Sequence, residues 1–182
     1  MATTFLNDID ENTVEALMKE TDENVKYFTE VSTKTASKYC EHLDKLMQTL
    51  YKRVIAIDSM TNEELERNVL ELTNLVYFMG DKVETLGIYD DMSEAAAKEV
   101  YNKAYLDVKL NADGKKPTVA ELTANAEQSA QYESVVNNIY ERAYKMVKFK
   151  IEAANKMIDV LRKVISRRMQ EQAMISRTPT EE

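Results

Sequence analysis

The C-terminal third of the chain decides its fold, because residues 118–176 contain neither proline nor glycine and read TVAELTANAEQSAQYESVVNNIYERAYKMVKFKIEAANKMIDVLRKVISRRMQEQAMIS. This stretch opens with Thr118, followed three residues later by Glu121, which is the spacing of a capping box at a helix start. Apolar residues then recur at alternating steps of three and four, as in a heptad repeat. We predict one very long helix over about residues 118–175, on the order of 85 Å in length. A rod of that length cannot bury its apolar stripe alone, so it must pack along other long helices, from its own chain or from identical copies.

The composition predicts an all-α protein. The 182 residues include only two prolines and three glycines, and no segment shows the alternating apolar pattern of a strand. We therefore expect an elongated helical bundle with coiled-coil-like packing that forms homo-oligomers. Cys40 has no second cysteine to pair with, which fits a reducing compartment. The chain shows no signal peptide and no apolar run of about 20 residues, so we expect a cytoplasmic protein without contact to a membrane.

Three further helices are expected before the long one. An apolar stripe runs over residues 22–57, and a second capping box, formed by Thr61 and Glu64, opens a heptad stripe that we expect to end at Gly87. A third helix is predicted over residues 93–110. The segment 111–117 combines Asn, Asp, Gly and Pro, which is typical of a loop between antiparallel helices.

This pattern divides the chain into three parts. Residues 1–57 are predicted to form an N-terminal helical arm, with a frayed start over residues 1–10. Residues 58–176 are predicted to form the helical bundle with its long C-terminal helix. Residues 177–182, which include a proline, are predicted to be a disordered tail.

The charge of the chain is unevenly distributed. The formal net charge is −8, yet residues 138–177 carry ten Lys and Arg against four acids, a local balance of +6. A polyanion responds to the local field, so this stretch can contact nucleic acid despite the acidic total. The alternative is that these cations face solvent or form ion pairs with the acidic helices.

Residues for catalysis are scarce. Cys40 and His42 stand two apart on a predicted helix and point to different sides, so they form neither a Cys–His pair nor a zinc site. With one histidine, the chain cannot build a di-iron bundle site. The acidic pairs Glu63-x-x-Glu66 and Asp81-x-x-Glu84 are of the kind that holds magnesium in all-helical nucleotide pyrophosphatases, but they are commoner as solvated helix faces. We predict no enzyme, no metal and no cofactor.

Binding of nucleic acid has more support. Lys115 and Lys116 precede the start of the long helix, where free N–H groups and the helix dipole favour an anion. Tyr101 and Tyr105 share a helix face and can stack on unpaired bases, at about 1–3 kcal/mol per base, although the same spacing is common for core tyrosines. The predicted contact residues lie around this loop and near the C-terminal end: Lys103, Tyr105, Lys109, Lys115, Lys116, Arg162, Lys163, Arg167 and Arg168.

The same region resembles a known group of proteins. The features that carry the resemblance are Glu99-Val100-Tyr101-Asn102-Lys103-Ala104-Tyr105-Leu106, the Gly-Lys-Lys loop, Thr118-Val119-Ala120-Glu121, Ala124, Ala126-Glu127, Leu161-Arg162 and Ile165-Ser166. Over roughly residues 61–172 the chain resembles small helical phage proteins that are related in pattern to UvsY-type recombination mediators. Those proteins carry a Lys-Ala-Arg-Leu-Asp-type motif. Here the motif reads Lys103-Ala104-Tyr105-Leu106-Asp107, so Tyr105 replaces an arginine and removes one cation.

The resemblance implies a function and a set of partners. It implies a non-enzymatic, ring-forming oligomer in the cytoplasm of the bacterial host. Such a protein binds single-stranded DNA and helps to load a recombinase onto strands covered by single-strand-binding protein. The alternative is a helical protein-interaction scaffold, or a phage-encoded inhibitor of a host protein, that does not bind DNA. The net charge of −8 and the acidic first hundred residues favour this alternative.

Overall fold

The computed structural model describes residues 11–110 and 116–176, and within them all regular structure is helical. The predicted all-α fold is therefore confirmed. The predicted frayed start, the tail over residues 177–182 and most of the predicted loop lie outside the described residues. The elements are α1 (Glu11–Val54), the 3-10 turn η1 (Ile57–Ser59), α2 (Asn62–Leu110), α3 (Val119–Ser129) and α4 (Gln131–Ile175).

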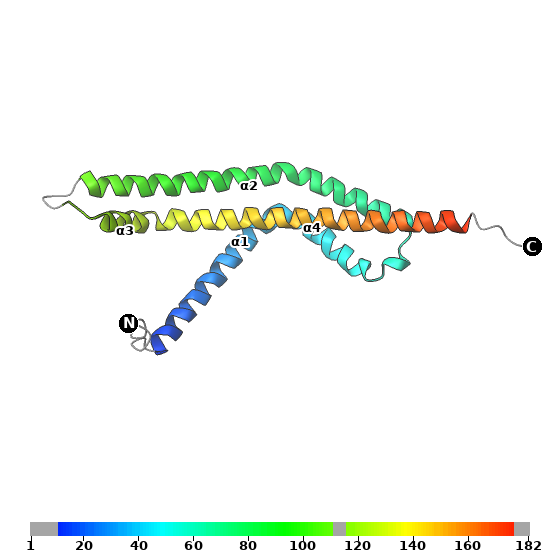
Figure 1. The fold of residues 1–182 in the computed structure, drawn as a ribbon, viewed down its shortest axis with the longest axis horizontal. Coiled ribbons are helices and arrows are strands. Elements are labelled where there is room, and N and C mark those ends of the chain that lie inside the picture. The colour runs from blue at the N-terminus through cyan, green and yellow to red at the C-terminus, as the bar shows by residue number, and fades with distance from the viewer. Residues whose placement is uncertain (1–10, 111–115, 177–182) are drawn as a thin grey trace, which may run out of the picture.

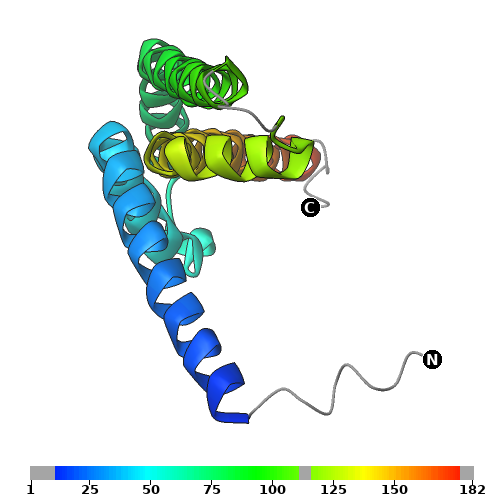
Figure 2. The same ribbon diagram turned by 90° about the vertical axis from the view of Figure 1, so that its left-hand side faces the viewer.

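The molecule is elongated (Figure 1). Helices α2 and α4 lie side by side and run in opposite directions over most of their length, and α3 extends the line of α4 along the last turns of α2. Helix α1 crosses α4, and its N-terminal part slants away from the other helices (Figure 2). Of the predicted N-terminal arm, the first half of α1 projects, whereas Ala36, Cys40, Leu43 and Leu50 of its second half are buried in the core.

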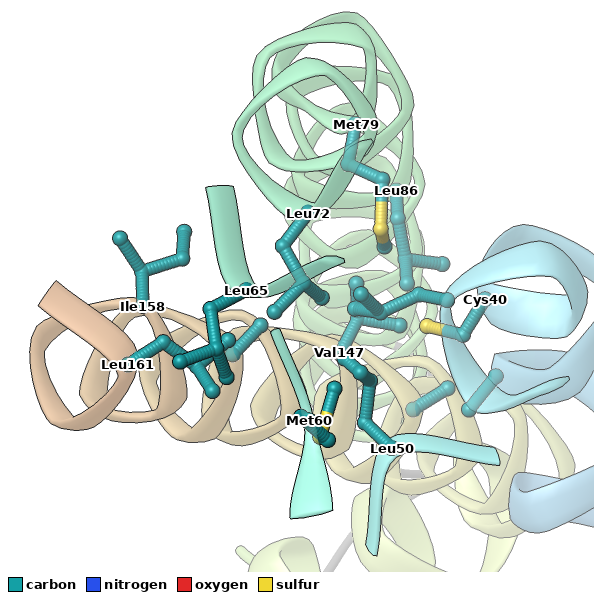
Figure 3. Packing of buried hydrophobic residues seen from close by; sticks show 14 residues of the cluster. Cys40, Leu50, Met60, Leu65, Leu72, Met79, Leu86, Val147, Ile158 and Leu161 are labelled. Atoms are coloured by element: carbon teal, nitrogen blue, oxygen red, sulfur yellow. The ribbon is translucent and has the colours of Figure 1, made fainter. Parts of the chain in front are cut away.

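The core lies where α1, α2 and α4 meet (Figure 3). Leu65, Leu72, Met79 and Leu86 of α2 stand at seven-residue intervals, and all four are buried. They pack against buried residues of α4 that recur at steps of three, four and seven, namely Ala143, Val147, Ala154, Ile158 and Leu161. This is the heptad packing that the sequence predicts for a pair of antiparallel helices.

The predicted helix end at Gly87 is wrong, because α2 continues without interruption from Asn62 to Leu110. Gly87 is helical, and a Cβ atom at this position would lie 3.4 Å from Cε2 of Tyr144 on α4. This is an ordinary van der Waals distance, so the Tyr144 ring leaves room for a small side chain at this position and not for a large one. Ser93, a predicted cap for a third helix, instead places its Oγ 2.9 Å from the carbonyl of Asp90 and 3.1 Å from Oδ1 of Asn137.

The predicted single helix over residues 118–175 is also wrong, because Ala130 separates α3 from α4. Ala130 has φ −92° and ψ 8°, outside the helical range. In the turns before it, the Ser129 hydroxyl donates to the carbonyl of Asn125 at 2.8 Å, and the Asn125 amide donates to the carbonyl of Glu121 at 2.9 Å. The same kind of bond from Thr73 and Thr85 leaves α2 unbroken, so these bonds accompany the break at Ala130 but do not by themselves cause it.

Candidate nucleic-acid interface

The predicted contact residues nearest to the α2–α3 connection lie at one end of the molecule. Lys103 and Lys109 are exposed on the last turns of α2, and Lys116 is exposed just before α3. Lys115 lies outside the described residues. The exposed lysines therefore flank the end at which the chain reverses direction between α2 and α3 (Figure 1). This end of the molecule, formed by residues 94–110 and 116–138, is called the hairpin end below.

The capping box at the start of α3 is confirmed. The hydroxyl of Thr118 accepts a hydrogen bond of 3.3 Å from the N–H of Glu121, and the N–H of Thr118 donates to the Glu121 carboxylate at 2.7 Å. This backbone hydrogen bond holds the pKa of Glu121 below its usual value. Because a carboxylate already occupies the helix N-terminus, the attraction of that terminus for a phosphate is weaker than the sequence suggests. Binding at this end depends on the lysines and on the aromatic rings.

Tyr101 and Tyr105 form a pair of rings at the same end. Their centroids lie 6.4 Å apart with an angle of 21° between the ring planes, and both side chains are half-buried. The sequence left open whether these tyrosines are core residues or surface residues. They take an intermediate position, each with part of its ring exposed, so the pair can extend a stack onto an unpaired base.

A groove of about 550 Å³ opens beside Tyr101, between α2 and the α3–α4 junction. Its polar lining combines four carboxamides with charged and hydroxyl groups: Asn102, Gln131, Asn137, Asn138, Glu94, Lys98, Glu127 and Ser134. Carboxamides both donate and accept hydrogen bonds, which suits the edges of unpaired bases. The sequence alone does not reveal this groove, because residues some 35 positions apart converge only when α2 and α4 run antiparallel.

The second predicted group lies far from the hairpin end. Arg162, Lys163 and Arg167 are exposed on α4, and Arg167 pairs with Glu171 at 3.6 Å. At about 1.5 Å per residue, Arg162 stands roughly 47 Å along α4 from its first residue, Gln131. One copy of the chain therefore does not bring the two predicted groups together (Figure 1).

Arg168 has a structural role. Its guanidinium donates to the carbonyls of Met60 at 2.6 Å and Ile57 at 2.8 Å, and it lies 3.3 Å from Oδ1 of Asn62. These partners belong to the connection between α1 and α2. The side chain is half-buried there, so it is not an exposed cation like its neighbours.

Other cations of the basic stretch, residues 138–177, also have partners within the chain. Lys150 pairs with Asp44 of α1 at 2.6 Å, Lys145 pairs with Glu141, and the Lys148 ammonium lies 4.7 Å from the centroid of the Tyr144 ring. For these three residues the alternative interpretation of the basic stretch holds. Arg142, Lys156 and Lys163 are exposed, and none of them forms an ion pair with another described residue.

These three cations lie on one face of α4 together with two apolar residues. Arg142, Phe149, Lys156 and Lys163 follow one another at seven-residue intervals, and Val160 is four residues from Lys156. Phe149 is 69% exposed and Val160 is 44% exposed. We call this set of five residues the basic row.

Cys40 and His42, the reactive side chains near one another in the sequence, lie in different environments. Cys40 is buried, and burial raises the pKa of its thiol, whereas His42 is exposed. Over residues 11–110 and 116–176, no group of three or more His, Cys, Asp and Glu side chains is placed to hold a metal ion. Within the same ranges, no helix has the length and apolar character needed to span a bilayer.

Compared with protein-family models, with curated proteins and with solved structures, the chain matches none of them.

Proposed function

We propose that the protein is a non-enzymatic, self-assembling accessory factor of DNA recombination that binds single-stranded DNA at its hairpin end. The observation that carries the proposal is the conjunction, at this end, of the paired rings of Tyr101 and Tyr105 with a groove whose lining includes four carboxamides. Exposed Lys103, Lys109 and Lys116 flank them. Stacking rings next to cations are the usual components of a site for unpaired strands.

Self-assembly is part of this proposal for an energetic reason. One hairpin end offers four described lysines, of which Lys98 pairs with Glu94, and the net charge of −8 opposes the approach of a polyanion. Several copies in one assembly would present the same site repeatedly to one strand, so modest contacts would add through avidity. Exposed Arg162 and Arg167 would reach that strand where a neighbouring copy brings its C-terminal end close to a hairpin end.

The role in recombination follows from the resemblance to UvsY-type mediators. In this role the assembly would hold the strand and help a recombinase to displace single-strand-binding protein. A long helical surface suits such a task, because it offers separate regions for the strand and for the two protein partners.

A protein-interaction scaffold is the second candidate, and the outer face of α2 favours it. Leu70, Tyr77 and Ile88 lie on the face opposite the buried heptad, and they are 62%, 78% and 51% exposed. Phe78 beside them is 68% exposed. Exposed Asp81 and Glu84 lie between Tyr77 and Ile88 on this face, so the apolar residues form two groups. Exposed apolar groups of this kind are typical of a surface that contacts another protein. The inhibitor of a host protein is a special case of this candidate.

The DNA-binding proposal is tested by fluorescence anisotropy with a labelled oligothymidine at low salt. The variant Lys103→Gln/Lys109→Gln/Lys116→Gln removes three cations at the hairpin end. Its matched control, Lys34→Gln/Lys38→Gln/Lys52→Gln, removes three exposed cations from α1. We expect the first variant to bind more weakly and to lose about 2 from the slope of log K against log salt, at about 0.7 per phosphate contact. The control should keep the wild-type slope.

Two outcomes would contradict the proposal. The first is no binding by the wild-type assembly at low salt, and the second is an equal loss of affinity in both variants. If the wild-type protein does not bind DNA and a stoichiometric protein partner survives nuclease treatment, the scaffold is the better description.

A further inference from the structure

The first half of α1 carries an apolar stripe that has no cover within the described chain. Met18 and Val25 are 63% and 57% exposed, and Phe28 beside them is half-buried. The same stripe continues along α1 into residues that are buried against the bundle, namely Ser32, Ala36, Cys40 and Leu43. The apolar face of α1 thus extends beyond the core that it helps to form (Figure 2). Below, "the arm" means residues 15–30 only, and not the longer predicted N-terminal arm over residues 1–57.

The arm is acidic. It carries more carboxylates than ammonium groups, with Glu15, Glu20, Asp22, Glu23 and Glu30 against Lys19 and Lys26. Asp22 stands four residues after Met18 and three before Val25, so it lies next to the apolar stripe, and Glu15 precedes it by seven residues on the same side. A surface that covers this stripe would therefore need to be both apolar and basic.

The basic row on α4 has this character along its line, with exposed Glu152 and Asp159 on one flank. Phe149 and Val160 supply exposed apolar surface, and Arg142, Lys156 and Lys163 supply cations without an ion-pair partner among the described residues. At about 1.5 Å per residue, the row spans roughly 32 Å and the arm roughly 24 Å. The arm therefore fits along the row in length as well as in charge.

The contact between α1 and α4 within one chain shows the same chemistry. Cys40 and Leu43 of α1 belong to one buried cluster with Ala143 and Val147 of α4 (Figure 3). Beside this cluster Asp44 of α1 pairs with Lys150 of α4 at 2.6 Å. An apolar stripe of α1 flanked by a carboxylate thus already packs on α4 next to a cation.

We infer that the arm of one copy packs along the basic row of a second copy. The arm of the same copy slants away from α4, so the covering helix must come from another molecule (Figures 1 and 2). Such a contact closes a two-fold dimer when the two copies exchange arms reciprocally, and it builds a ring or an open filament when each copy passes its arm to the next. The inference rests on the self-assembly in the proposed function and assigns Lys163, which the sequence predicts as a strand contact, to the interface.

Sedimentation velocity at micromolar concentration tests this interface with charge reversals. One variant reverses two charges of the arm, Glu15→Lys/Asp22→Lys. Another reverses two charges of the basic row, Arg142→Glu/Lys156→Glu. All four side chains are exposed, so both variants should keep the helical content of the wild-type protein by circular dichroism. We expect the wild-type protein to sediment as an oligomer and each variant to shift toward 20.9 kDa.

Mixing the two variants in equal amounts is the decisive test. The lysine-bearing arm of one variant meets the glutamate-bearing row of the other, so the mixture should regain the larger species.

The matched control reverses two exposed acids of α2, Glu84→Lys/Asp91→Lys, and should assemble like the wild-type protein. Wild-type assembly in both variants, or loss of assembly in the control alone, would overturn the inference and leave self-assembly in place. A wild-type protein that sediments at 20.9 kDa would refute the self-assembly in the proposed function itself.

Discussion

The guanidinium of Arg168 donates a 2.6 Å hydrogen bond to the backbone carbonyl of Met60, 108 residues earlier in the chain. A second bond, to the carbonyl of Ile57, fixes the same side chain against η1. Met60 is itself buried in the core, so this contact ties the C-terminal part of α4 to the turn that joins α1 and α2. A cation that the sequence predicts as a DNA contact thus contributes to the fold.

Replacing Arg168 with Ala should therefore lower stability. The change leaves two carbonyl groups without a charged donor, and hydrogen bonds to charged groups contribute about 1.5–3 kcal/mol each at most. We expect a loss of about 1–3 kcal/mol in the free energy of unfolding, measured by urea denaturation. Arg162→Ala, at an exposed position on the same helix, is the control and should change stability by less than about 0.5 kcal/mol. Equal stability of the two variants would show that the Arg168 contact contributes nothing.

The two described glycines of α2 should respond differently to a large side chain. A Cβ at Gly80 meets no atom within 4 Å, whereas at Gly87 it lies 3.4 Å from the Tyr144 ring. Gly80→Ala should stabilise the protein by about 0.5–1 kcal/mol through helix propensity. Gly80→Leu should also be tolerated, but Gly87→Leu should lower the melting temperature, because Tyr144 occupies the space. If both leucine variants melt alike, Tyr144 does not limit the size of the side chain at Gly87.

The capping box of α3 should give a pH-dependent contribution. Thr118→Ala should cost about 1 kcal/mol at pH 7. The folded-state pKa of Glu121 is lowered, so its contribution is present above the unfolded value of about 4.3 and is lost as the pH falls below it. Glu121→Gln should therefore reduce helicity and melting temperature at pH 7 and match the wild-type protein near pH 3. A difference that persists unchanged at pH 3 would contradict this role.

Asp90 should behave in the opposite way. Burial is the main cause that raises its pKa, and nearby Glu141, Asp91 and Glu94 add to the rise. Because the folded state binds this proton more tightly than the unfolded state, the charged carboxylate destabilises the protein at pH 7, and its protonation in mild acid relieves the cost.

Asp90→Asn should accordingly raise the melting temperature at pH 7. Its advantage over the wild-type protein should shrink as the pH is lowered toward 4. Asp81→Asn, an exposed acid on the same helix, serves as the control. An advantage that does not change with pH would mean that charge is not the reason.

The sequence predicts those features that depend on local chemistry. The heptad from Leu65 to Leu86 and the two capping boxes were read from spacing alone, and the structure contains them. Thr61 and Glu64 exchange bonds of 2.9 and 3.2 Å, as the motif requires. Such features are predictable because all their partners lie within a few residues of each other.

The errors arise where a local signal has two meanings. Gly87 matches the pattern of a helix end, yet α2 continues through it and packs beside Tyr144, a residue 57 positions away. Ala130 gives no warning of a break in the sequence, because alanine is a strong helix former and no proline or glycine stands beside it. The role of Arg168 and the groove beside Tyr101 were equally beyond local reasoning, since each needs the antiparallel arrangement of α2 and α4.

The most direct test of the account is sedimentation velocity of the full chain with a labelled oligothymidine, followed at separate wavelengths for protein and label. Self-assembly and strand binding at the hairpin end require the label to sediment with a protein species several times larger than 20.9 kDa. The Lys103→Gln/Lys109→Gln/Lys116→Gln variant should form the same species and carry less label. Protein at 20.9 kDa with the label sedimenting separately would contradict the account.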